Sequence, residues 1–192
     1  YNQILEIDPR SFKAYQGLGV IYERRGELDN AESSLRQGMQ YNPDEALLFY
    51  DLGIVLEKKG KLDEATVALE TAIDKKPKLI DAMLHVAELY VKLNRFQDAE
   101  RKLLDAVTED KANVQIKSML AAVYEAQGNH LKAKELLEES LKGDPKNDVL
   151  LTNLGITLVN LGEVDIGLEK LQNAVAINAK NSLAHGALGW AY

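Results

Sequence analysis

Apolar residues along the chain fall into pairs of short stretches, each with the spacing of one helix face. In the first pair, Tyr15 and Tyr22 lie in one stretch, and Leu28 and Leu35 lie in the next. Residues seven positions apart share one face of an α-helix, so each stretch predicts an amphipathic helix. Gly26 interrupts the pattern and predicts a tight turn. The sequence therefore predicts two antiparallel helices joined by that turn.

The same pattern returns every 34 residues without an insertion. Leucine fills one column throughout, at Leu35, Leu69, Leu103, Leu137 and Leu171. Small residues fill two further columns, Gly19, Gly53, Ala87, Ala121, Gly155 and Gly189 in one, and Ala31, Ala65, Ala99, Ala133 and Gly167 in the other. Small side chains at these two places predict a close approach of the paired helices. A fixed period of this length is typical of stacked helical repeats.

Breaks and caps keep the same period. We expect turns near Gly26, Gly60, Asn94, Gly128 and Gly162, and helix ends before Pro43, Pro77 and Pro145. Proline lacks the amide donor that a helix interior needs. We expect helix N-caps from the side-chain oxygens of Ser11, Asn113, Asn147 and Asn181.

Taken together, these columns resemble the tetratricopeptide repeat. The residues that carry the resemblance are Tyr15-x-x-Leu18-Gly19-x-x-Tyr22, then Ala31-x-x-x-Leu35, then Pro43, with equivalents in the later units. The chain departs from the pattern at Lys117, where an apolar residue is usual, at Gly167, and in the leucine column, where an aromatic residue is usual. The resemblance implies an all-α fold, a right-handed superhelical solenoid of antiparallel helix pairs.

We expect one array over residues 1–192, cut from a longer one. Its predicted parts are the end of a preceding repeat at 1–11, five full repeats at 12–45, 46–79, 80–113, 114–147 and 148–181, and the first helix of a sixth repeat at 182–192. The segment Ser182–Tyr192 carries no charge, whereas a solenoid usually ends on a polar capping helix. The last helix is therefore expected to be covered by a further repeat.

Composition and charge reduce the classes of function that the chain is expected to have. The net charge of −7 would repel a phosphate backbone, so nucleic acid is not an expected partner. Cysteine is absent, which removes disulfides and thiolate metal sites, and no apolar run reaches the length of a membrane span. Neither a catalytic motif nor a cofactor motif is present, and the three histidines lie in different repeats, so we expect no enzyme, metal or cofactor. The sequence does not determine the cellular compartment. The cytoplasm is favoured, and the periplasm or secretion are the alternatives.

In the tetratricopeptide family the first helix of each repeat lines a binding groove, and we call these the front helices. The family's ligand contacts recur at fixed positions within the repeat, which we call phases. The residues at those phases in this chain are the candidate groove positions, namely Tyr50, Ile54, Leu84, Glu88, Met119, Ala122, Asn153, Ile156 and Trp190. The basic carboxylate clamp of heat-shock co-chaperones and the asparagine ladder of glycosyl-transferring relatives are both absent at these phases. Residues 151–192 hold five charged side chains, against 48 in the first 150. This contrast predicts a more apolar groove in the C-terminal half, although ordinary core packing would also explain it.

The favoured function is a protein-interaction scaffold that holds a partner peptide or helix in the groove. A first alternative is the regulatory or substrate-recruiting arm of an enzyme whose catalytic domain lies outside this segment. A second is a structural array that associates with itself through its open ends or its groove.

Overall fold

The computed structural model describes residues 1–191, and these form helices without a strand. The chain divides into two compact units, Tyr1–Arg95 and Phe96–Tyr192. Each is described by itself, and the third predicted repeat, 80–113, is divided between them. Tyr192, the predicted last residue of the sixth front helix, lies outside the described residues.

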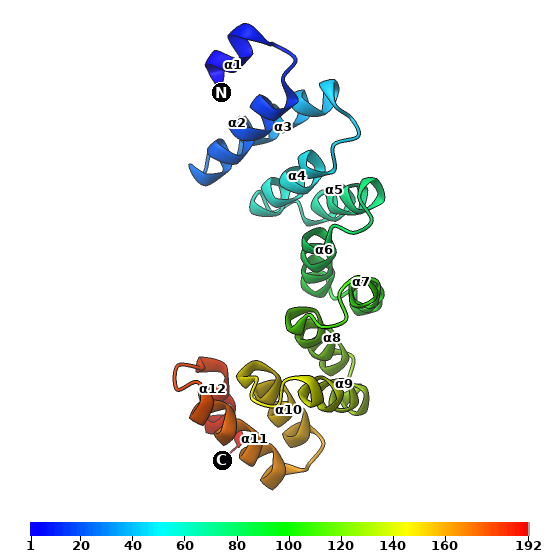
Figure 1. The fold of residues 1–192 in the computed structure, drawn as a ribbon, viewed down its shortest axis with the longest axis vertical. Coiled ribbons are helices and arrows are strands. Elements are labelled where there is room, and N and C mark those ends of the chain that lie inside the picture. The colour runs from blue at the N-terminus through cyan, green and yellow to red at the C-terminus, as the bar shows by residue number, and fades with distance from the viewer. Residues whose placement is uncertain (192) are drawn as a thin grey trace. The chain divides into compact units, whose positions relative to one another are not determined.

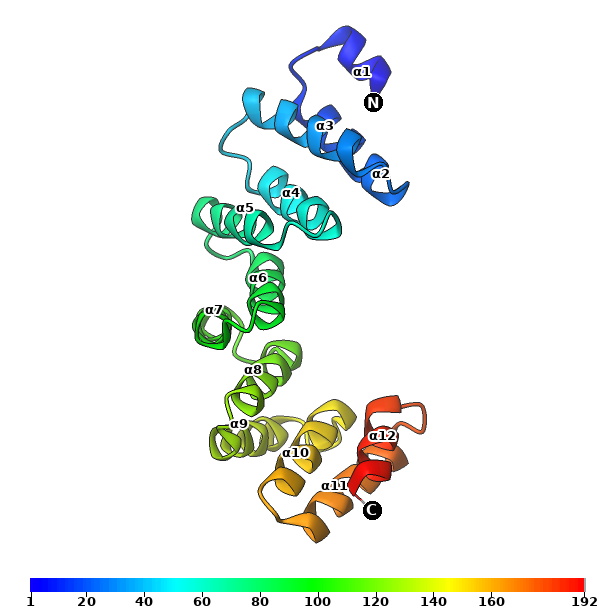
Figure 2. The same ribbon diagram turned by 180° about the vertical axis from the view of Figure 1, so that it is seen from behind.

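The first unit contains six helices among the described residues. They are α1 (Asn2–Ile7), α2 (Phe12–Arg24), α3 (Leu28–Tyr41), α4 (Ala46–Lys58), α5 (Leu62–Lys75) and α6 (Ile80–Lys92). Both views of the ribbon show α2 beside α3 and α4 beside α5, each pair antiparallel and joined by a short turn (Figures 1 and 2). The front helices of this unit are α2, α4 and α6.

The second unit continues the pattern. Its helices are α7 (Phe96–Glu109), α8 (Val114–Ala126), α9 (His130–Gly143), α10 (Asp148–Asn160), α11 (Val164–Ile177) and α12 (Ser182–Ala191). Here α10 and α11 form an antiparallel pair, and α12 packs on both of them (Figure 1). The front helices are α8, α10 and α12. The predicted all-α fold of repeated antiparallel helix pairs is confirmed.

The predicted turns are also confirmed. The helices break around five residues with positive φ, namely Gly26 (76°), Gly60 (75°), Asn94 (57°), Gly128 (73°) and Gly162 (83°). This left-handed backbone is strained for residues with a side chain, apart from asparagine and aspartate, which tolerate it best. The helices before Pro43 and Pro77 end at Tyr41 and Lys75.

Close packing explains the small-residue columns. A Cβ atom added to Gly19 would lie 2.6 Å from Cγ of Leu35, and one added to Gly53 would lie 2.7 Å from Cγ of Leu69. Ala65, in the other small-residue column, is fully buried. The leucine column therefore fills the space that the small residues leave open between paired helices.

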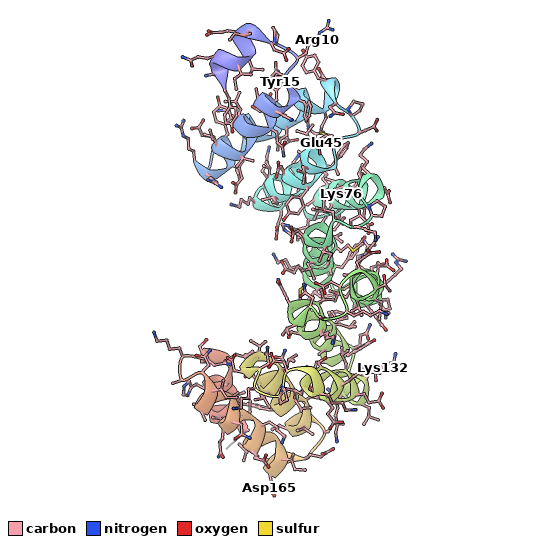
Figure 3. All side chains as sticks on the ribbon, viewed as in Figure 1. Arg10, Tyr15, Glu45, Lys76, Lys132 and Asp165 are labelled. Carbon is pink, nitrogen blue, oxygen red and sulfur yellow. The ribbon has the colours of Figure 1, made fainter. Side chains whose placement is uncertain are left out.

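The capping prediction is confirmed at three positions and wrong at one. Oδ1 of Asn113 accepts from the amides of Gln115 and Ile116, and the side chains of Asn147 and Asn181 cap α10 and α12 in a similar way. Ser11 makes no such side-chain bond. Its backbone carbonyl accepts from the amides of Ala14 and Tyr15 instead, so α2 begins without a side-chain cap. At the same phase Glu45 caps α4 through its carboxylate, at the helix start marked in Figure 3.

Polar bridges join neighbouring front helices at one recurring place. In the first unit Lys58 donates to Glu23, and Lys92 donates to Glu57. In the second unit Nδ2 of Asn160 donates to Glu125 over 2.6 Å. Each bridge joins residues 35 positions apart, one repeat plus one residue. These bridges join α2 to α4 and α4 to α6 in the first unit, and α8 to α10 in the second.

Candidate binding face of the front helices

In the second unit, three predicted groove residues line one concavity. Its volume is about 230 Å³, and its walls come from α8, α10 and α12. The lining residues are Ala121, Ala122, Glu125, Asn153, Ile156 and Leu183. Four of these six side chains are apolar, and Leu183 is more than half exposed. The site therefore offers hydrocarbon walls with one amide and one carboxylate, which is the composition of a shallow peptide-side-chain pocket.

Glu125 is the charged residue of this concavity, and its two oxygens differ. Oε2 accepts from Asn160 and lies 2.9 Å from Nδ1 of His130. Oε1 is buried and has no hydrogen-bond partner among the described residues. An unsatisfied buried oxygen is costly, so Glu125 holds this position at a cost in stability. The sequence analysis missed Glu125, although it lies one helical turn beyond Ala122 and shares its face.

The first unit has a second concavity between α2 and α4. Its volume is about 210 Å³, and its lining is Gly19, Val20, Glu23, Arg24, Leu35, Asp51, Ile54 and Val55. Ile54 is the predicted groove residue among them. Asp51 accepts a hydrogen bond of 2.8 Å from Nε2 of Gln16. Burial raises the pKa of Asp51 above its ordinary value, Glu23 raises it further, and the bond from Gln16 opposes both.

Tyr50 and Glu88, two further predicted groove residues, are electrostatically linked in the first unit. The half-buried ring of Tyr50 meets the ring of His85 edge-on, with centroids 6.0 Å apart at 75°. Burial raises the pKa of the Tyr50 phenol, and the carboxylates of Asp81, Asp51 and Glu88 add to the effect. These four side chains therefore form one acidic and aromatic patch on α4 and α6.

His85 is held by a carboxylate on the neighbouring front helix. Its Nε2 lies 2.5 Å from Oε2 of Glu57, whose other oxygen accepts from Lys92. Burial alone would raise the pKa of Glu57, but the hydrogen bonds from Lys92 and His85 outweigh burial and lower it. Glu57 therefore stays ionised beside two donors, and it is not a free acid of the front face.

The remaining predicted groove residues are scattered. Leu84 is only 7% exposed, so it packs inside its unit more than it faces solvent. Met119 is half-buried and Trp190 is 64% exposed, and neither lines a concavity described above. Each front face thus has a compact candidate site within its own unit. A further concavity of about 390 Å³ lies on α2, and its lining includes Tyr1, Lys13 and Gln16.

A larger concavity lies away from these faces. It measures about 410 Å³, between α3 and α5 over the outer side of α4, and its walls include Met39, Phe49 and the exposed Val67. Its residues sit at phases that carry no ligand contacts in the family resemblance. Residues 1–191 hold neither a side-chain cluster able to bind a metal ion nor a helix long and apolar enough to cross a bilayer.

Two curated proteins match parts of the chain. The protein O-mannosyl-transferase TMTC1 of Homo sapiens is 25% identical over 180 residues, which is 92% of this chain and 20% of that protein. Protein bimA of Emericella nidulans is 38% identical over 48 residues, 25% of this chain and 6% of that protein. The chain thus corresponds to a small part of either relative.

Solved structures share the fold. The tetratricopeptide protein YrrB, described as having an unusual peptide-binding site, superposes with a TM-score of 0.77 at 20% identity, covering 97% of this chain and 96% of that one. A tetratricopeptide protein from Parabacteroides merdae gives 0.85 at 19% identity, covering 95% and 72%.

Residues 15–143 match the family described as the middle TPR-like domain of cilia and flagella-associated protein 70. That match covers four of the five leucines in the leucine column and residues on both sides of the division between the two units. Tetratricopeptide repeats are generally interaction scaffolds, whose stacked helices present extended binding surfaces. The chain belongs to this family of TPR-like domains.

Proposed function

We propose that the chain is a protein-interaction scaffold that holds a partner segment on its front helices. The observation that carries this proposal is the concavity of the second unit, where α8, α10 and α12 contribute Ala122, Ile156 and Leu183 to one apolar wall. Such a wall in water favours a covering apolar side chain.

The polar groups of the concavity support the same proposal. Asn153 lines it with an amide that has no hydrogen-bond partner among the described residues, and Glu125 adds a carboxylate to the lining. Few polar groups among apolar ones are what orients a peptide in a groove. YrrB, which shares the fold, is described as having a peptide-binding site, and a peptide is the class of partner we propose here.

The test measures the affinity of a peptide that is first selected from a display library for binding to the purified chain. Ile156→Lys together with Met119→Lys should weaken binding of that peptide about tenfold or more, because the charge placed at Ile156 lies in the apolar wall and must lose its water when the peptide binds. Met119 is a predicted groove residue outside the concavity, and its substitution tests whether the peptide also lies along α8. Leu131→Lys is the matched control, since Leu131 is 65% exposed on the back helix α9. It should leave the affinity within about twofold. If the parent chain, the double variant and the control variant bind the peptide equally well, the binding site lies on the back helices and the proposal is wrong.

A second candidate function rests on the similarity to TMTC1. An O-mannosyl-transferase contains a stretch 25% identical to 92% of this chain, so the chain would serve as the recruiting arm of a larger enzyme. In that case the display-selected peptide should compete with an acceptor protein for the full-length enzyme. The scaffold role of the front helices is common to both candidates.

A further inference from the structure

We infer that the front face of the first unit docks a partner segment in which basic side chains are interspersed with apolar ones. This inference rests on the proposed function and adds the chemistry of the partner. The surface consists of the concavity between α2 and α4 and the adjoining patch of Tyr50, Asp51, Asp81 and Glu88. Asp51 belongs to both, so the two parts are continuous.

The apolar part of the surface is the lining of the concavity. Val20 of α2 and Ile54 of α4 are half-buried and face it, with buried Val55 beneath. The volume of about 210 Å³ accepts one or two aliphatic side chains of a partner. Burying such a side chain is favourable but insufficient for specific binding without polar contacts.

The acidic part of the surface lacks counter-charges. Asp81 and Glu88 are exposed and have neither a hydrogen bond nor an ion pair with another described residue. Asp51 has one partner, the neutral amide of Gln16. The nearby carboxylates of Glu23 and Glu57 differ, because lysines on the next front helix neutralise them. Three carboxylates of this face are therefore left for a ligand to pair.

A cationic side chain, that of Arg24, also belongs to this surface. Arg24 lines the concavity at the end of α2. Gly17 is the α2 residue equivalent to Asp51, and Arg24 lies seven residues beyond it, about 10 Å along the helix. The negative charge is thus concentrated on the α4 and α6 side of the face. Lys58 and Lys92 lie at the equivalent ends of α4 and α6, where each pairs with a glutamate of the preceding front helix. A partner that places its basic residues over Asp51, Asp81 and Glu88 lies on the N-terminal side of these cations.

The spacing of the carboxylates favours several cations over one. Asp81 and Glu88 are seven residues apart on α6, so about 10 Å separates their attachment points. A single ammonium group cannot bond both, whereas basic residues along a peptide can. The ring of Tyr50 adds a surface on which an arginine or lysine can stack. Because burial penalises the ionised form of Asp51 and raises its pKa, an approaching cation would also relieve that penalty.

The experiment uses a fluorescent probe peptide in which lysine and leucine alternate. Two comparison peptides carry glutamate for lysine or serine for leucine. The site variant is Asp81→Asn with Glu88→Gln. The control variant is Asp74→Asn with Glu139→Gln, two exposed acids on the back helices α5 and α9, which changes the net charge equally. All four substituted positions are exposed, and circular dichroism checks that both variants are folded.

We expect the probe peptide to bind the parent chain, and both comparison peptides to bind at least tenfold more weakly. The site variant should lose about tenfold in affinity for the probe, and the control variant less than twofold. Added salt should weaken the parent complex more than the site-variant complex. Equal losses in the two variants would show attraction to net charge alone and overturn the inference. So would an unchanged affinity in the site variant. The proposed function would survive either result if Ile156→Lys together with Met119→Lys still weakened binding of the display-selected peptide about tenfold or more.

Discussion

Gln16 of α2 donates a hydrogen bond of 2.8 Å to Oδ2 of Asp51 in α4, across one full repeat. The pair ties two front helices together and positions a carboxylate where burial opposes its charge. Asp51 therefore contributes to the acidic face at a cost in folding stability. That combination is common where a residue serves binding more than folding.

Replacing Asp51 by asparagine should raise the melting temperature at neutral pH. Asparagine keeps an oxygen that can accept from Gln16, and it removes the charge that burial penalises. Because the pKa of Asp51 is raised on folding, the folded chain holds that proton more tightly than the unfolded chain. The penalty is complete above the folded-state pKa and vanishes as the pH falls below the ordinary value of 3.8.

Thermal unfolding followed by circular dichroism over a pH series checks this prediction. The advantage of the variant should shrink towards acid pH. Asp74→Asn, on the exposed side of α5, serves as the control and should change stability by less than about 0.5 kcal/mol at any pH. A variant less stable than the parent at neutral pH would mean that the charge of Asp51 stabilises the fold.

Gly155→Ala should destabilise the second unit by about 1–3 kcal/mol through overpacking. The added Cβ would lie 2.6 Å from Cγ of Leu171 and 2.9 Å from the backbone oxygen of Gly167, and the backbone cannot move aside cheaply. Gly143→Ala is the matched control, because no atom lies within 4 Å of its Cβ position at the end of α9. It should be neutral or slightly stabilising. Urea unfolding of the two variants distinguishes steric cost from a general effect of alanine.

Ala65→Leu tests the second small-residue column in the first unit. Ala65 is 0% exposed between the paired helices, so three extra carbon atoms should cost roughly 1–3 kcal/mol. Val67→Leu, two residues further along α5, changes a side chain that is 67% exposed and should cost almost nothing. If the melting temperatures of the two variants agree, Ala65 does not lie where the repeat packs most tightly.

The periodicity of the sequence was sufficient to predict the helix pairs and their turns. Each turn has a local cause, such as the positive φ of Gly60, and each packing column repeats often enough to be recognised. The candidate site was harder, because phase indicates which side of a helix a residue occupies but not how deeply its neighbours cover it. Leu84 and Ile156 have groove phases, yet Leu84 is 7% exposed and buried, whereas Ile156 lines a concavity.

Pairings between repeats could not be predicted from the sequence either. The bond between Gln16 and Asp51 depends on the side-chain conformations of two residues that are 35 positions apart and lie on different helices. The same holds for Glu125, whose unsatisfied oxygen results from where Asn160 and His130 happen to reach. The sequence pattern identifies which residues share a face, whereas side-chain packing decides which of them are left without partners.

The caps give a prediction that separates sequence pattern from structure. Ser11 and Asn113 occupy the same phase and both precede a front helix, but only Asn113 bonds to the free amides of its helix, over 3.0 and 3.2 Å. Asn113→Ala should therefore cost about 1 kcal/mol, and Ser11→Ala close to nothing, because its side chain satisfies no helix amide. Hydrogen exchange at the first turn of α8 should accelerate about fivefold in the asparagine variant, as expected for that loss of local stability. The first turn of α2 should be unaffected by the serine variant. Equal effects in the two variants would mean that Ser11 also caps its helix in solution.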